Sequence, residues 1–162
     1  MSKTEAEQLA SVYSDQPERI QELIDLIRTN TYPIANKAAW VVRRIAEKKP
    51  QLILPYFDYL VEFGHSATHQ GVRRECFKAA IEAKSQVSVD SDQAGRLLQL
   101  AFKSMECQQS ICEQFYAMEV LDYYIKPFPE LKEEYIALLR LNSHWGTAAS
   151  KKRMLKRIVE LE

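Results

Sequence analysis

The sequence predicts an all-α protein built as a short stack of about four helix pairs. Apolar residues recur at spacings of three and four nearly throughout the chain, and no stretch alternates strictly for long. Only four glycines and six prolines are present among 162 residues, which is too few turn formers for a many-stranded protein. Hydrophobic residues make up 46% of the chain, so we expect a single domain over residues 1–162 with its own core.

The helices are expected in a regular order along the chain. A short opening helix near residues 4–13 precedes pairs near 14–48, 50–85, 90–126 and 129–162. The first helices of these pairs are expected near 17–29, 51–63, 91–105 and 130–141. The second helices are expected near 33–48, 69–84, 110–125 and 147–161.

Local signals indicate several of the boundaries. Asp15 stands two residues before a proline, an arrangement that favours a helix N-cap followed by a first-turn proline. Ser110 and Glu113 have the spacing of a capping box. Gly64 and Gly71 are expected to bracket a loop between two helices.

The second helices form a repeat that is weak in identity but regular in pattern. When they are stacked, two columns of apolar residues coincide. The first column is Ile45, Ile81, Leu121 and Ile158, with spacings of 36, 40 and 37 residues, and the second is Val41, Phe77, Ala117 and Met154. A helix pair cannot bury its apolar face alone, so this periodicity predicts that several pairs stack.

This period, together with the run KKPQLILPYFDYLVEF followed by GVRRECFKAAIEA, resembles HEAT or armadillo-like helical repeats. The resemblance covers nearly the whole chain and implies an α-solenoid, a short right-handed α-α superhelix. It also implies that the second helices line the concave face. It concerns architecture and says little about function.

Charge is distributed unevenly although the formal net charge is zero. Fifteen of the 22 basic residues, but only eight of the 22 acidic ones, lie within or next to the second helices. If those helices line one face, that face is electropositive. The alternative is an ordinary solvated face whose charges pair between neighbouring helices. Glu119 and Asp122 make the third second helix acidic, which favours that pairing.

Trp40 is the most informative candidate binding residue, because it shares the basic side of its helix with Arg43 and Arg44. Alternatively, it packs against a neighbouring helix. We expect the binding surface to comprise Trp40, Arg43, Arg44, Arg73, Arg74, Arg153, Lys156 and Arg157.

The leading hypothesis is a non-enzymatic scaffold or adaptor that binds a protein or acidic peptide on this basic concave face. The alternative is nucleic-acid binding, because the chain is also similar to the DNA alkylpurine glycosylases in helix pairing and basic face. No catalytic residue of that family can be carried over to Trp40 or Asp122. A third hypothesis is acid–base catalysis by Glu119 and Asp122, against which interhelical ion pairing is favoured.

No cofactor, metal site or catalytic residue is expected. His65, His69 and Cys76 are too few and too dispersed for a zinc site. Cys107 and Cys112 complete a set of three cysteines that indicates reduced thiols in a cytoplasmic protein. The first residues lack the apolar segment of a signal peptide, and no apolar run predicts a membrane span. We expect a monomer or an end-to-end dimer.

Overall fold

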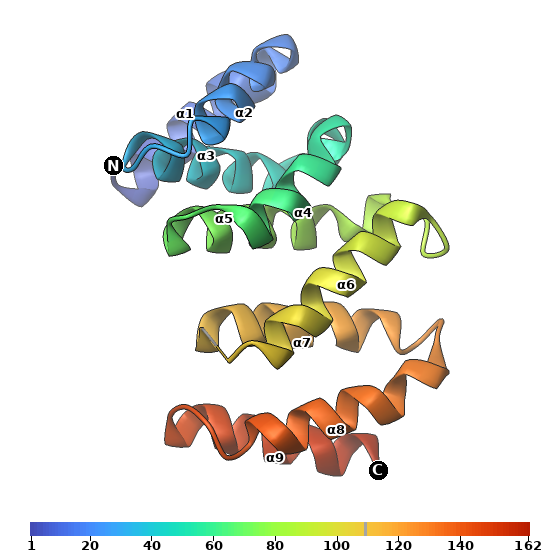
Figure 1. Cartoon of the computed structure of the whole chain (residues 1–162). Helices are drawn as coiled ribbons and strands as arrows, with labels where there is room; N and C mark the ends of the chain where they lie inside the picture. The colour runs from blue at the N-terminus through green and yellow to red at the C-terminus, as the bar shows by residue number, and fades with distance from the viewer. Residues whose placement is uncertain (109) are drawn as a thin grey trace. The chain divides into compact units, whose positions relative to one another are not determined.

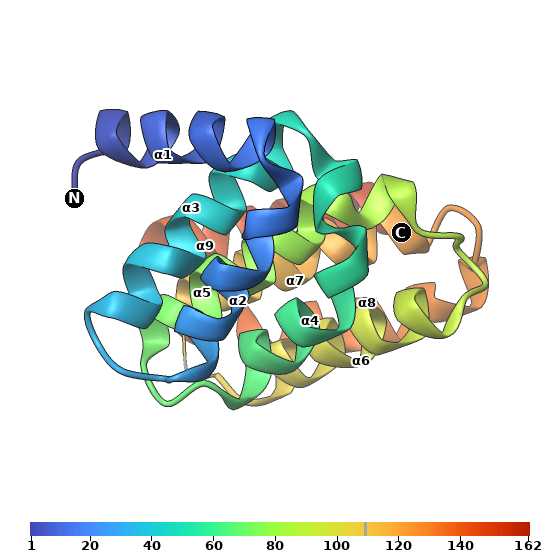
Figure 2. The ribbon, with the colours of Figure 1, turned by 90° about the horizontal axis from the view of Figure 1, so that it is seen from above.

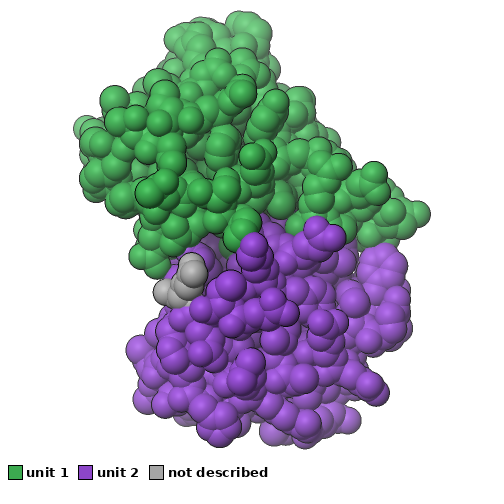
Figure 3. All heavy atoms as spheres, in the orientation of Figure 1, with its two compact units in different colours: residues 1–96 green, residues 97–162 purple. Residues whose placement is uncertain are grey.

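The computed structural model describes residues 1–108 and 110–162, and it is helical with no strand in these ranges (Figure 1). The described residues group into two compact units, residues 1–96 and 97–162 (Figure 3). The boundary falls within one helix, α6 (Asp92–Glu106). The all-α class is therefore confirmed, while the single domain and its right-handed superhelix stay predictions.

The first unit contains five complete α-helices joined by short 3₁₀ segments. The α-helices are α1 (Lys3–Asp15), α2 (Ile20–Arg28), α3 (Ile34–Lys48), α4 (Phe57–Ser66) and α5 (Gln70–Ala83). The 3₁₀ helices are η1 (Pro17–Arg19), η2 (Pro50–Tyr56) and η3 (Lys84–Gln86). Two of these 3₁₀ segments begin at a proline, whose missing N–H costs nothing at a helix start.

Two rows of helices form this first unit. Helices α1, α3 and α5 pack side by side in one row, and α2 and α4 pair with α3 and α5 respectively (Figures 1 and 2). The opening helix α1 thus occupies a place in the row of second helices. The core between the rows holds fully buried side chains such as Ile24, Ile45, Leu60 and Phe77.

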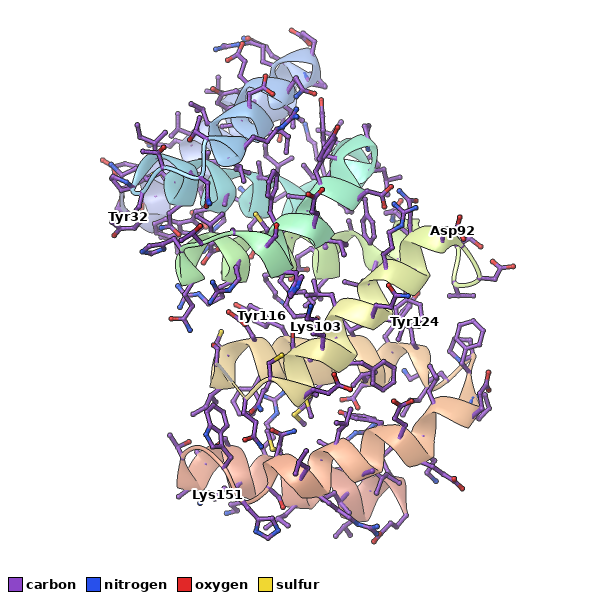
Figure 4. All side chains as sticks on the ribbon, viewed as in Figure 1. Tyr32, Asp92, Lys103, Tyr116, Tyr124 and Lys151 are labelled. Carbon is purple, nitrogen blue, oxygen red and sulfur yellow. The ribbon has the colours of Figure 1, made fainter. Side chains whose placement is uncertain are left out.

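The second unit is built around α7 (Ile111–Tyr124), with η4 (Pro129–Leu131), α8 (Lys132–Asn142) and α9 (Ala148–Leu161) following it. Every residue from Ile111 to Tyr124 is buried or half-buried, so α7 is the central helix of this unit. Tyr124, labelled in Figure 4, is fully buried and packs edge-on against the Tyr123 ring at 5.0 Å.

A buried amide pair ties three helices of the second unit together. Gln114 Nε2 on α7 donates to Asn142 Oδ1 on α8. Asn142 Nδ2 in turn donates to the carbonyls of Met105 (2.8 Å) and Leu138 (2.9 Å). Both amide side chains are completely buried. Since a buried polar group needs a partner, this pair fixes how α6, α7 and α8 meet.

The repeat pattern is confirmed in detail. The four second helices begin and end within one residue of their expected bounds. Both apolar columns are buried: the residue with the greatest exposure in either is Ile158 at 7%. Ser110 accepts from the Glu113 backbone N–H at the start of α7, as its capping position predicts. These second helices are therefore the core-forming elements of each pair.

One boundary prediction is wrong, and a second needs a more detailed description. Asp15 does not cap the helix that follows it in the chain. Helix α1 continues through Asp15, and Gln16 separates α1 from η1. Gly64 and Gly71 flank the short connection at residues 67–69, as expected, although each lies within a helix, α4 and α5 respectively. Gly71 is also needed for packing: a Cβ at this position would overlap the side-chain amide oxygen of Asn36 on α3.

Candidate functional site

A chain of alternating charges crosses from α3 to α5 in the first unit. Arg43 Nε donates to Glu47 Oε1 at 3.1 Å, one turn along the same helix. Arg43 Nη1 donates to Glu75 Oε2 at 3.0 Å, across to α5. Glu47 Oε2 also accepts from Arg44 Nη1 at 2.6 Å. Arg74 Nε lies 3.7 Å from Glu75 Oε1 and completes the ladder.

We call these five residues, Arg44, Glu47, Arg43, Glu75 and Arg74, the arginine ladder. Their formal charges sum to one net positive charge. Glu75 is only 6% exposed, and a carboxylate buried to that extent requires cationic partners. Arg43 therefore follows the alternative interpretation of the basic face, in which charges pair between neighbouring helices. Arg74 has the most open cationic side chain of the ladder, with 45% of it exposed.

Trp40 stands beside this ladder. Its side chain is half-buried, which lies between the two interpretations drawn from the sequence. The Arg44 guanidinium carbon is 6.0 Å from the centre of the Trp40 ring system, at the outer limit of a cation–π contact. The aliphatic side of α3, including Val41, Val42 and Ile45, is buried as expected.

Arg73 has a structural task despite its place among the predicted binding residues. Its Nη1 donates to the carbonyl oxygens of Ala67 (2.9 Å) and Thr68 (3.2 Å) in the α4–α5 connection. Thr68 in turn receives a hydrogen bond from Asn30 Nδ2 at 2.7 Å. Arg73 therefore holds a connection whose carbonyls would otherwise lack donors.

The second unit contains its own group of predicted binding residues on α9. Arg153 lies over the Phe115 ring, with its guanidinium carbon 4.4 Å from the ring centre. Arg157 donates from Nε to Asp122 Oδ1 at 2.7 Å and from Nη1 to Glu160 Oε2 at 3.1 Å. These residues, with Lys156, line a polar cleft of about 240 Å³.

The same cleft bears on the catalytic hypothesis. Asp122 Oδ1 accepts a second hydrogen bond from the Tyr135 hydroxyl at 3.0 Å. Burial, together with the nearby Asp122 carboxylate, raises the pKa of Tyr135 well above its usual range. Asp122 is thus the acceptor of an interhelical ion pair with Arg157, as favoured from the sequence.

The remaining candidate ligands lie in separate settings. His65 is in the last turn of α4. His69 caps α5: its Nδ1 accepts from the Gly71 N–H at 3.1 Å, and its ring stacks on Tyr32 at 4.1 Å. Cys76 is buried, and that burial raises the pKa of its thiol. Within residues 1–108 and 110–162, no group of three or more metal-ligating side chains comes together.

Sequence reasoning missed an apolar groove at the α1 edge of the first unit. Leu9 and Val12 of α1 are 42% and 47% exposed there, and Ile34 at the start of α3 is 50% exposed. The missed signal is their spacing, because Glu5, Leu9 and Val12 form one stripe along α1.

None of the described helices combines the length and apolarity needed to cross a bilayer.

Paired helices with a charged face on their second-helix row define a helical-repeat scaffold. A family model described as HEAT repeat domain matches residues 1–160, so the chain belongs to the HEAT repeat family. Comparison with curated proteins and with solved structures gives no match. HEAT repeat proteins typically mediate protein interactions and are typically non-enzymatic.

Proposed function

We propose that this protein is a non-enzymatic interaction module that captures an acidic protein segment on the α3–α5 face of its first unit. The observation that carries the proposal is the pairing of the half-buried Trp40 with an arginine ladder that ends in the open Arg74. Tryptophan and arginine are the residue types that most often anchor protein interfaces.

The ladder supplies order as well as charge. Glu47 and Glu75 fix Arg43 and Arg44 in place, so little side-chain entropy remains to be lost on binding. Arg74 then offers a planar guanidinium suited to a carboxylate of the partner. Because the ladder holds one net positive charge, we expect specificity for a few placed carboxylates rather than strong attraction to any polyanion.

Quantitative affinity capture tests the proposal with two matched variants. Arg44→Glu/Arg74→Glu reverses two charges on the face. Lys126→Glu/Lys132→Glu makes the same charge change at lysines that have no carboxylate within ion-pair distance among the described residues. We expect at least one polypeptide to be retained by wild type and control but lost from the face variant. Identical retention by all three proteins would contradict the proposal.

A second candidate, nucleic-acid binding, is favoured by one specific observation on α9. Lys151, labelled in Figure 4, and Lys152 have no acidic partner within ion-pair distance in the described part of the chain. Uncompensated lysines beside Arg153 suit phosphate contacts.

Fluorescence anisotropy with labelled single- and double-stranded DNA across a salt series tests this candidate. Binding that weakens steeply with salt and is lost in Lys151→Glu/Lys152→Glu would support it, and a base-release assay would follow because of the glycosylase likeness. Absence of binding at low salt would remove the candidate.

We also propose that the protein acts in the cytoplasm, which imaging of the tagged full chain would check.

A further inference from the structure

The α1 edge of the first unit carries an apolar opening that is separate from the charged faces already described. Two adjoining clefts of about 510 and 230 Å³ share Leu9 and Lys37 as lining residues. We call them together the N-terminal groove. Its walls are Leu9 and Val12 of α1 and Leu26 of α2, and its floor includes Ile34 and Lys37 of α3.

The groove exists because of the place of α1 in the helix rows. Helix α3 pairs with α2, and helix α5 pairs with α4, so each has a partner in the other row of helices. Among the described residues, α1 packs on α3 and η1 and has no partner of this kind. Its apolar stripe therefore faces solvent where the other second helices are covered. Exposed side chains of this size in one groove are typical of an interaction surface.

Three charges lie within this apolar setting: Lys37, Glu5 and the N-terminal ammonium of Met1, which lies 3.9 Å from Glu5 Oε2. Lys37 is exposed, and no carboxylate of a described residue lies within ion-pair distance of its ammonium group. Glu5 is exposed on the α1 wall, where it accepts a hydrogen bond from the Ser2 N–H. Hydrogen bonds from Ser2 hold the pKa of Glu5 below its ordinary value, with smaller contributions from the N-terminal amine and Lys37, so Glu5 is ionised at neutral pH.

We propose that a second copy of this chain docks groove to groove, related by a two-fold axis. Leu9 and Val12 of each copy then pack against Leu26 and Ile34 of the other. Glu5 of each copy faces Lys37 of the other, so the contact contains two equivalent ion pairs. The interface is isologous, because the same patch serves both sides.

Self-complementarity favours a second copy over a foreign helix. A foreign helix would need a carboxylate for Lys37, a cation for Glu5 beside the N-terminal ammonium, and apolar residues between them. The groove itself has all three, since Glu5, Leu9 and Val12 form one stripe opposite Lys37. The groove involves only the end of one unit, so we expect an interface near the lower end of specific ones, about 1,200 Å² in total, and a micromolar dimer.

A charge-swap experiment on the full chain tests the proposal. Sedimentation velocity measures the mass of wild type, Glu5→Lys and Lys37→Glu, each across roughly 1 to 100 µM, the range in which a micromolar dimer forms. Wild type is expected to shift from monomer to dimer. Each variant alone places like charges at both pairs and stays monomeric. An equimolar mixture of the two variants restores both pairs, so the dimer is expected to return.

Several outcomes would overturn the proposal. One is a wild type that stays monomeric throughout the concentration series. Another is a dimer that persists in both single variants, and a third is a mixture that fails to recover. Far-ultraviolet circular dichroism separates a misfolded variant from a folded monomer. Leu26→Glu provides an independent second variant, in which a folded chain is expected to lose dimerisation without recovery in any mixture.

Discussion

The two units use the same device to join neighbouring second helices, but in different surroundings. In the first unit Arg43 reaches Glu75 on the adjacent helix and Glu47 on its own. In the second unit Arg157 reaches Asp122 across and Glu160 along. The Glu75 side chain is 8% exposed, whereas the Asp122 side chain is 36% exposed. An arginine that bridges two carboxylates is therefore a core contact in one unit and a cleft contact in the other.

This difference separates structural arginines from arginines that remain available for binding. In the first unit the buried carboxylate commits Arg43 to the fold, and Arg74 remains open at the end of the arginine ladder. In the second unit the solvated pair lies in a cleft that Arg153 and Lys156 also line, so its carboxylate does not commit Arg157 to the core. A count of basic residues does not distinguish the two units, whereas the burial of the paired carboxylates does.

The largest expected effect comes from breaking the buried pair. Arg43→Ala leaves Glu75 with only a distant contact to Arg74, and we expect the free energy of unfolding to fall by about 3 kcal/mol. Arg157→Ala removes the more solvated pair, and a loss of about 1 kcal/mol is expected. Urea denaturation of both variants measures the difference. Equal losses would contradict the contrast between the two units.

Two glycines in helices give a matched comparison of packing. Gly71→Ala is expected to destabilise the protein by about 1 kcal/mol, because its methyl group meets the Asn36 amide across the α3–α5 contact. Gly95→Ala places a methyl group where no atom lies within 4 Å, so it is expected to stabilise by about 0.5 kcal/mol. Thermal unfolding of both proteins tests the opposite signs. Asn36→Ala should relieve the Gly71→Ala defect.

Alkaline pH should destabilise the fold. Burial raises the pKa of Tyr124 to about 12, and burial also raises the pKa values of Tyr135 and Cys76. The unfolded chain loses these protons first, so their contribution is complete below the unfolded pKa values and falls as pH rises toward the folded ones. We expect a loss of up to about 1.4 kcal/mol per pH unit for each group above roughly pH 9.

Urea midpoints measured at closely spaced pH values check this slope. Tyr124→Phe removes one titrating group and should reduce the alkaline loss. An unchanged slope in that variant would show that Tyr124 does not contribute.

The smallest effect concerns thiol reactivity. Cys107 is exposed and should react with a thiol reagent in the native protein, whereas the buried Cys76 should react only on unfolding. Timed alkylation followed by peptide mass spectrometry distinguishes the sites. Equal rates at both cysteines in the native state would contradict the burial of Cys76.

Helix periodicity made most of the fold predictable, because each second helix needs apolar residues at fixed spacing to contact its neighbours. Both apolar columns, which end in Ile158 and Met154, are buried as expected, and the second helices begin and end within one residue of their expected bounds. The packing role of Gly71 was not predictable, because it depends on the contact with Asn36, a residue far away in the sequence. Local spacing contains no information about such an approach.

The candidate site was predictable in composition but not in its pairing. The helical spacing put Trp40 and Arg44 on the same side of α3, and the structure gives them a common contact. The tie between Arg43 and Glu75 spans two helices, and one sequence does not reveal which acid faces which base. For the same reason Arg73 was assigned to binding, although it donates to loop carbonyls.

The most direct test of the central claim uses Trp40 as its own reporter. Trp145→Phe leaves Trp40 as the only tryptophan of the chain. Acrylamide quenching of its fluorescence is then measured with and without the polypeptide recovered by affinity capture. We expect the added polypeptide to protect Trp40 from quenching, and Arg74→Glu to abolish this protection while far-ultraviolet circular dichroism shows that the variant is folded. Quenching that is the same with and without the captured polypeptide would contradict the assignment of the α3–α5 face as the binding surface.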